Sequence, residues 1–235
     1  MAHATQREFI SILAENMPRF FSGCRVLEVG SLDINGSIRD FFKDDCKYIG
    51  LDIGEGKGVD VVCEGQKYDA PDGSFDHVIS CEVMEHNPYW VETFQNMVRV
   101  CRPGGLVVMT CATTGRSEHG TSRTTAGDSP LTTEAGWEYY KNIKKSDFEK
   151  RVAPEDQFSS YFIGVNWVSY DLVFFGIKMG ASDNKEPFEY TMRAVNEYLA
   201  RRNAELLPKV RKSFAAIAGD KGFEMARSIR NTLKN

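Results

Sequence analysis

Short runs of apolar residues recur through the first half of the chain, and their alternation with helical segments constrains the fold more than any other feature. The runs are RVLEVG, YIGLDI, GVDVVCE, DHVISCEV and LVVMTC, which begin at residues 25, 48, 58, 76 and 106. Strands that are buried on both faces read as continuous apolar runs, so this alternation predicts a mostly parallel sheet covered by helices on both faces. Ligands of such sheets bind at the carboxyl ends of the strands.

Helical and hairpin patterns complete this outline. We expect helices over Thr5 to Met17, over GSIRDFFKD from Gly36 or Ser37, and over YWVETFQNMVRVC, which the turn residues RPGG end. The aromatic and β-branched stretch at residues 157–179 predicts a hairpin at the edge of the sheet. The pattern is helical again from Glu186 onward.

The turn from Gly30 to Gly36, after the first apolar run, discriminates between nucleotide cofactors. It lacks the three-glycine spacing that lets a backbone approach a pyrophosphate, and Asp33 inside it would repel a phosphate. A cofactor that carries positive charge and no phosphate reverses the argument, because Glu28 and Asp33 would attract it. S-adenosylmethionine, with its ammonium and sulfonium groups, fits this turn. Asp33 either faces the ligand or caps its own turn.

Asp52 ends the second apolar run and follows Gly30 by about 20 residues. An acid at this distance from the glycine turn is placed to bind the hydroxyls of a ribose. NAD and S-adenosylmethionine both carry a ribose, so Asp52 does not separate them. An NAD-dependent enzyme therefore stays as the weaker alternative.

Four segments resemble, in order, the motifs of class I S-adenosylmethionine-dependent methyltransferases, of the group related to small-molecule methyltransferases. They are VLEVGS, YIGLDI, DGSFDHVISCEVMEHN and MVRVCRPGGLVVMT. The resemblance covers about residues 22 to 112, and it departs from the family at Leu32, where a second glycine normally stands. It implies a Rossmann-like α/β fold: a doubly wound, mostly parallel seven-stranded sheet with helices on both faces and an antiparallel C-terminal edge strand.

The resemblance also implies roles for individual residues. Glu28 and Gly30 would face the methionine part of the cofactor, Asp52 the ribose, and Ile53 the adenine. The acid-plus-small pair after the third run would meet the adenine, and the end of the fourth run would line the far side of the cofactor. The implied cofactor-binding set is Glu28, Gly30, Ser31, Asp52, Ile53, Glu64, Gly65, Ser80, Cys81 and Glu82.

A long polar segment, ATTGRSEHGTSRTTAGDSP, follows the fifth run at residues 112–130. Connections of this length are usually functional or disordered, and this one should emerge on the ligand side of the sheet. It contains His119, and a histidine there can take a proton from a substrate hydroxyl. We therefore name His119 and His86 as catalytic candidates; the alternatives are an exposed loop histidine and a structural histidine. Arg116 and Asp128 would order the segment or bind a polar substrate.

No metal ligands are assigned, because the six cysteines show no CxxC spacing; His119, Asp128 and Asp147 form one set that could converge. We expect reduced cysteines in a cytoplasmic protein, since the N-terminal residues lack the pattern of a signal peptide. No run of about 18 apolar residues predicts a membrane span. The net charge of -4 argues against a nucleic-acid partner, and the basic C-terminal helices would be amphipathic and suited to a homodimer.

The predicted function is S-adenosylmethionine-dependent methylation of a polar small molecule, as O-methylation of a sugar, glycan or metabolite hydroxyl. N- or C-methylation, where a base matters less, and a non-catalytic cofactor-binding protein are the alternatives. The predicted organisation is a methyltransferase domain at residues 1–180, with a substrate-side insert at 112–150, and a helical C-terminal extension at 181–235.

Overall fold

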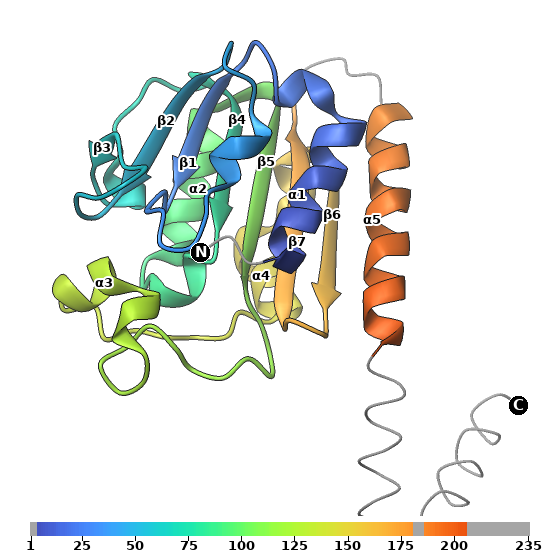
Figure 1. The fold of residues 1–235 in the computed structure, drawn as a ribbon. Helices are drawn as coiled ribbons and strands as arrows, with labels where there is room; N and C mark the ends of the chain where they lie inside the picture. Colours follow the sequence, from blue (N-terminus) through green and yellow to red (C-terminus); the bar gives the residue numbers. More distant parts are fainter. Residues whose placement is uncertain (1–3, 181–185, 206–235) are drawn as a thin grey trace, which may run out of the picture.

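A seven-stranded sheet forms the centre of the computed structural model, which describes residues 4–180 and 186–205. The strand order is β3-β2-β1-β4-β5-β7-β6 (Figure 1). The strands are β1 (Arg25–Val29), β2 (Lys47–Asp52), β3 (Val61–Val62), β4 (Phe75–Cys81), β5 (Cys101–Ala112), β6 (Phe158–Asn166) and β7 (Asp171–Lys178). The predicted fold class is confirmed.

The pairing of the strands is parallel from β3 to β5 and antiparallel on both sides of β7. The hairpin predicted at residues 157–179 is therefore confirmed, with its turn at Trp167–Tyr170 between β6 and β7. The antiparallel strand lies one place inside the sheet, and β6 occupies the edge. The carboxyl ends of β1, β2, β4 and β5 consequently meet at one edge of the sheet.

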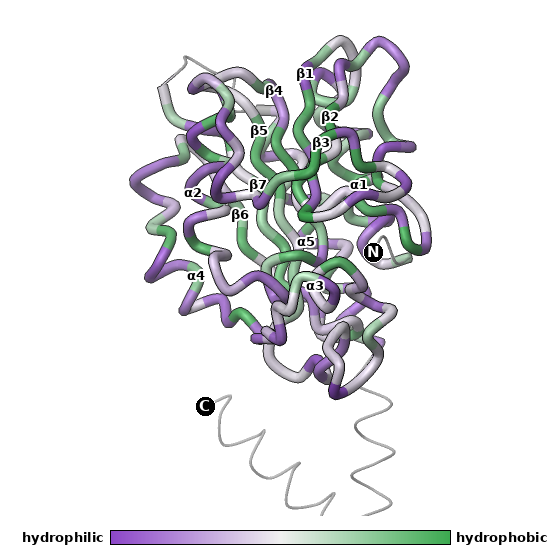
Figure 2. The backbone as a smooth tube through the Cα atoms, turned by 90° about the vertical axis from the view of Figure 1, so that its left-hand side faces the viewer, coloured by the Kyte–Doolittle hydropathy of each residue, from purple (hydrophilic) through white to green (hydrophobic). Residues whose placement is uncertain are grey.

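Helices cover both faces of this sheet (Figure 1). On one face lie α1 (Ala4–Asn16) and α5 (Glu186–Ala204), which contact each other, and on the other lie α2 (Trp90–Val100) and α4 (Lys145–Val152). Two apolar cores result, one beneath each pair of helices. Figure 2 shows hydrophobic strands at the centre of the molecule and hydrophilic segments around them.

Two sequence predictions were wrong in detail. GSIRDFFKD forms only a short 3₁₀ helix, η2 (Ile38–Phe41), which begins after a side-chain cap from Ser37. Phe42 leaves the helical conformation and stacks on Phe21 at 4.8 Å, so tertiary packing overrides the helical pattern. The segment RPGG ends α2 but lies inside β5, which begins at Cys101.

The C-terminal region is described only through α5. This helix buries Phe188, Val195, Tyr198 and Leu199 in the core that it shares with α1. The remaining helices expected after Ala204 lie outside the described residues. Within the described part of the chain, no helix combines the length and apolar character of a bilayer span.

The segment after β5 crosses the carboxyl edge of the sheet before it reaches α4. It contains a 3₁₀ turn, η5 (Ala126–Asp128), and one short helix, α3 (Pro130–Glu134). Figure 1 shows α3 beneath the ends of β1, β2 and β3. This position is the ligand side that the sequence predicted.

Candidate active site

A cavity lies at the carboxyl ends of β1, β2 and β4, with about 640 Å³ of space that includes open solvent. Residues from the strand ends form one side of it, and residues 128–137 form the other. Of the predicted cofactor-binding set, the lining residues are Gly30, Asp52, Ile53, Gly65 and Glu82.

Gly30 is fixed by its surroundings at the base of this cavity. Its φ is +83°, and a Cβ atom there would lie 2.0 Å from Cγ2 of Val83. Its N–H donates to the carbonyl oxygen of Leu51 at 2.7 Å, which ties the end of β1 to β2. Only glycine allows this backbone conformation and this approach.

The turn after Gly30 is held by two carboxylates. Asp52 accepts the backbone N–H groups of Leu32 at 3.0 Å and Ile53 at 2.8 Å, and burial raises the pKa of Asp52. Asp33 accepts the N–H of Gly36 at 2.7 Å and pairs with Lys57 at 2.6 Å; these hydrogen bonds lower the pKa of Asp33. Asp33 therefore caps its own turn, and Leu32 lines the cavity where the family normally has glycine.

Five residues of the predicted set do not line the cavity. Glu28 is buried and accepts the hydroxyl of Tyr48 at 2.8 Å; burial raises its pKa to about 7. Glu64 forms an ion pair with Lys67 at 2.6 Å and precedes Gly65, which lines the cavity. The other three, all buried, are Ser31, Ser80 and Cys81.

Glu82 lines the cavity in a strained backbone conformation, with a φ of +56°. Its Oε1 accepts the hydroxyl of Thr110 at 3.1 Å and the side-chain amide of Gln6 at 3.4 Å. Gln6 also donates to Thr110 at 2.7 Å, so α1 takes part in building this end of the cavity. No sequence pattern pointed to Gln6, which lies far from the motifs along the chain.

The covering side of the cavity comes from a segment that the sequence assigned only in general terms. Trp137 lines the cavity and packs edge-on against Tyr89 at 5.9 Å between ring centroids. The other lining residues of this side are Asp128, Ser129, Pro130, Leu131 and Thr132. Their small and polar composition gave no periodic signal, and only the length of the segment indicated a role.

A second, open pocket adjoins the first. It is lined by the segment after β5 and by the β6–β7 turn, with Asp128 common to both pockets. Arg116 lines it and donates to the carbonyl oxygen of Ser169 at 2.5 Å, and it approaches Asp171 at 3.5 Å. His119 lines it as well, and its Nδ1 lies 3.1 Å from the carbonyl oxygen of Ser117. A polar pocket of this kind suits a hydrophilic acceptor.

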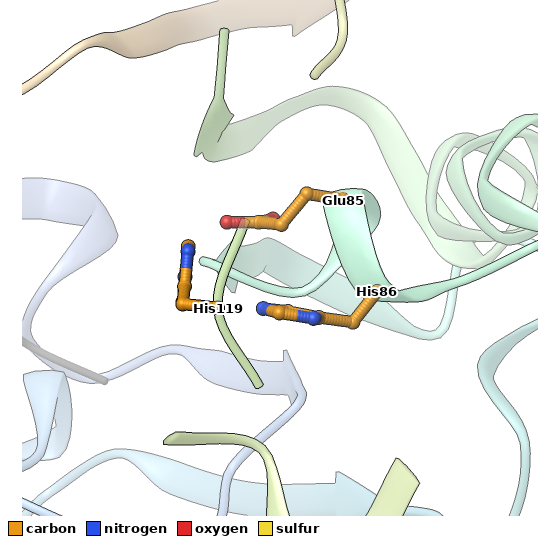
Figure 3. A group of neighbouring side chains, drawn as sticks. All are labelled: Glu85, His86 and His119. Carbon is orange, nitrogen blue, oxygen red and sulfur yellow. The ribbon is translucent and has the colours of Figure 1, made fainter. Parts of the chain in front are cut away.

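The two catalytic candidates meet where these pockets adjoin. The rings of His86 and His119 lie edge-to-face with centroids 4.9 Å apart, and the ring of Tyr140 contacts both at 5.4 and 5.0 Å. Glu85 joins them: Figure 3 shows its carboxylate and both imidazoles pointing toward one another. Burial lowers the pKa of His86 to about 4, while burial and the charge of Glu82 raise that of Glu85.

Glu85 is a residue that the sequence reasoning missed. The spacing in CEVMEH placed Glu82, Glu85 and His86 together after a strand end, which was the available signal. Asp128 and Asp147, which the sequence grouped with His119, do not belong to this cluster in the described structure.

Comparison with known proteins agrees with this geometry. Residues 19–109 match the family described as Methyltransferase domain. A search of curated proteins by sequence finds no significant match. The chain is similar in structure to a Haemonchus contortus phosphoethanolamine N-methyltransferase 2 bound to phosphomonomethylethanolamine and S-adenosylhomocysteine, with 15% identity and a TM-score of 0.52. That match covers 74% of this chain and 52% of the other, so this chain spans about half of that enzyme's length.

Two further solved structures are similar over more of their own length. The Burkholderia thailandensis 1,6-didemethyltoxoflavin-N1-methyltransferase, bound to 1,6-didemethyltoxoflavin and S-adenosylhomocysteine, has 12% identity and a TM-score of 0.52, covering 75% of this chain and 79% of that one. A SAM-dependent methyltransferase from Aquifex aeolicus has 13% identity and a TM-score of 0.51, covering 76% and 93%. At these identities the similarity shows the fold.

Proposed function

We propose that the chain, whose residues 19–109 match the family described as Methyltransferase domain, is an S-adenosylmethionine-dependent enzyme that methylates a hydroxyl group of a polar small molecule. The observation that carries this proposal is the junction of two pockets. One pocket has the glycine and the acid expected around S-adenosylmethionine, and the other is open, polar and lined by Arg116, His119 and Asp128.

Within this proposal, Asp52 binds the ribose hydroxyls and Ile53 packs on the adenine, as both line the first cavity. The methyl group leaves its sulfur as the acceptor oxygen attacks, and the electron pair of the broken bond stays on sulfur. Alignment and exclusion of water supply most of the rate acceleration, and the hydroxyl proton needs an acceptor. His119 lines the second pocket beside His86 of the first, and we propose that it promotes the loss of this proton.

N-methylation is the second candidate, because two solved structures similar to this chain are described as N-methyltransferases. If the acceptor atom is nitrogen, transfer of the methyl group is expected to need no base. We also propose a small-molecule acceptor and a cytoplasmic location, the latter supported by six cysteines that are all unpaired in the structure.

The test is transfer of labelled methyl groups to a panel of sugars, hydroxylated metabolites and amines. We expect a hydroxylated acceptor to be labelled, with His119→Ala slowing transfer about 100-fold while leaving cofactor affinity unchanged. Labelling of amines alone, at the same rate in both proteins, would contradict O-methylation.

A further inference from the structure

We propose that Glu85, His86 and His119 bind a divalent transition-metal ion, which holds the acceptor hydroxyl; the second half of this inference rests on the function proposed above. The carboxylate oxygen and the two imidazole nitrogens all lie within 4.8 Å of one another, and Figure 3 shows them converging on one point. Ligands about 2 Å from an ion lie about 3 Å apart. Since His119 is partly exposed, rotation of its side chain can close the remaining gap.

Unpaired buried atoms make this cluster unusual. Glu85 is fully buried, and its Oε1 accepts one hydrogen bond, from the N–H of Ala112 at 3.1 Å. Its Oε2 and the Nδ1 of His86, which is 4% exposed, have no hydrogen-bond partner among the described residues. Within residues 4–180 and 186–205, no cationic side chain forms an ion pair with Glu85. A buried carboxylate in this state is costly, and a bound cation would compensate it.

The backbone around the cluster is shaped to keep the two histidines close. Gly120 follows His119 with a φ of +63°, and a Cβ atom there would lie 2.7 Å from Cε1 of His86. The glycine thus lets the segment after β5 press against His86. Tyr140 completes the arrangement, because its hydroxyl donates to the carbonyl oxygen of Ser117 at 3.1 Å and its ring packs on both imidazoles.

The ligand types define the class of metal. Two imidazoles and one carboxylate suit zinc, cobalt, manganese or iron, whereas magnesium and calcium prefer oxygen ligands. Three protein ligands leave coordination positions open, which is typical of catalytic rather than structural sites.

The position of the cluster indicates what those open positions would hold. His86 lines the cofactor cavity, and His119 lines the open polar pocket. A hydroxyl bound to the ion there would have a lowered pKa and lose its proton to water. Its oxygen then forms the bond to the methyl carbon as the carbon–sulfur bond breaks. In this arrangement His119 serves as a metal ligand, and no separate base is required.

Cobalt binding to the tag-free full chain tests the site without cofactor or acceptor. We expect saturable binding of one Co²⁺ per chain, with visible absorption bands, and weaker binding by about 100-fold in His119→Ala and in Glu85→Gln. The matched control is Glu134→Gln, which removes an exposed carboxylate of α3. Thermal unfolding without metal checks that each variant is folded.

The possible outcomes test the metal site separately from the proposed function. Absence of saturable binding of Co²⁺, Zn²⁺ and Mn²⁺ would overturn the metal site, as would binding that both folded variants retain. The proposed function is measured independently, through binding of S-adenosylmethionine and labelling of hydroxylated acceptors. Metal binding that responds to both substitutions supports the site even where no hydroxyl is methylated. If methylation occurs, we expect a chelator to abolish it and Co²⁺ to restore it in the wild type but not in His119→Ala.

Discussion

The strand-end side of the cavity and the segment that covers it, residues 113–142, are held by different interactions. On the strand-end side, Gly30 and Asp52 are fixed by backbone hydrogen bonds and by close packing against Val83. The covering segment is held by exposed polar contacts, such as the pairs of Arg123 with Glu118 at 2.6 Å and Glu138 at 3.4 Å. The first side is therefore specified by shape, and the second, apart from the packing of Gly120 against His86, by polar contacts that tolerate more variation.

Substitution of Gly30 is expected to have the largest effect on the stability and cofactor binding of the strand-end side of the cavity. Gly30→Ala forces a Cβ against Val83 in a left-handed conformation, and we expect a loss of about 3 kcal/mol in unfolding free energy together with loss of cofactor binding. Urea unfolding and calorimetry measure the two effects. Gly127→Ala, in the covering segment, is the matched control, because a Cβ there meets nothing within 4 Å. Equal effects of the two substitutions would contradict the distinction.

The pH dependence of stability gives the next largest effect. Burial raises the pKa of Glu28 to about 7, so the folded chain holds its proton more tightly than the unfolded chain does. The unfolding free energy should therefore fall by about 3 kcal/mol as the pH rises from about 4.5 to about 7. Glu28→Gln should remove this decrease while keeping the hydrogen bond from Tyr48. Unfolding curves at several pH values that fall equally in both proteins would rule out Glu28 as the cause.

Replacement of the carboxylate of Asp52 by an amide should weaken cofactor binding. It should also loosen the turn after Gly30, because one of the backbone N–H groups of Leu32 and Ile53 loses its acceptor oxygen. We expect Asp52→Asn to lower the affinity for S-adenosylmethionine about 30-fold, roughly 2 kcal/mol, because the ribose loses a charged acceptor. In the wild type, affinity should also decline on acidification at a higher pH than an ordinary aspartate would give, since burial raises the pKa of Asp52. Asp69→Asn, at an exposed acid, is the calorimetric control; equal affinity of the two variants would remove Asp52 from the site.

The smallest effect is expected in the covering segment. Arg123→Ala should change the unfolding free energy by less than about 1 kcal/mol, because its ion pairs are exposed. It should nevertheless raise the rate of proteolytic cleavage within residues 113–142. Lys67→Ala, which breaks an exposed pair on the strand-end side, should leave that rate unchanged. A large loss of stability in Arg123→Ala would show that the covering segment is part of the folding core.

The same difference explains what the sequence could predict. Apolar runs and the positions of Gly30 and Asp52 identified the sheet, its ligand edge and much of the cofactor side, because strand burial and turn geometry leave a local signal. The failure at GSIRDFFKD has a tertiary cause, the packing of Phe42 against Phe21. Gln6 could not be found, since its role depends on contacts between segments distant in sequence.

The cluster of Glu85, His86 and His119, where the two pockets adjoin, could be predicted from the sequence only in part. His86 and His119 were identified as separate candidates from their places along the chain. The distance of 4.9 Å between their ring centroids and the participation of Glu85 depend on how the covering segment folds back. Spacing placed Glu85 beside His86, and only the three-dimensional arrangement shows that its Oε2 is buried without a partner.

We infer that the cavity at the ends of β1, β2 and β4 is a site for a cationic, phosphate-free cofactor. Calorimetric titration of the chain with S-adenosylmethionine and with NAD tests this inference most directly. We expect one S-adenosylmethionine bound per chain, no binding of NAD, and loss of the S-adenosylmethionine signal in Gly30→Ala but not in Gly127→Ala. Binding of NAD, or binding of S-adenosylmethionine that survives in a folded Gly30→Ala protein, would contradict it.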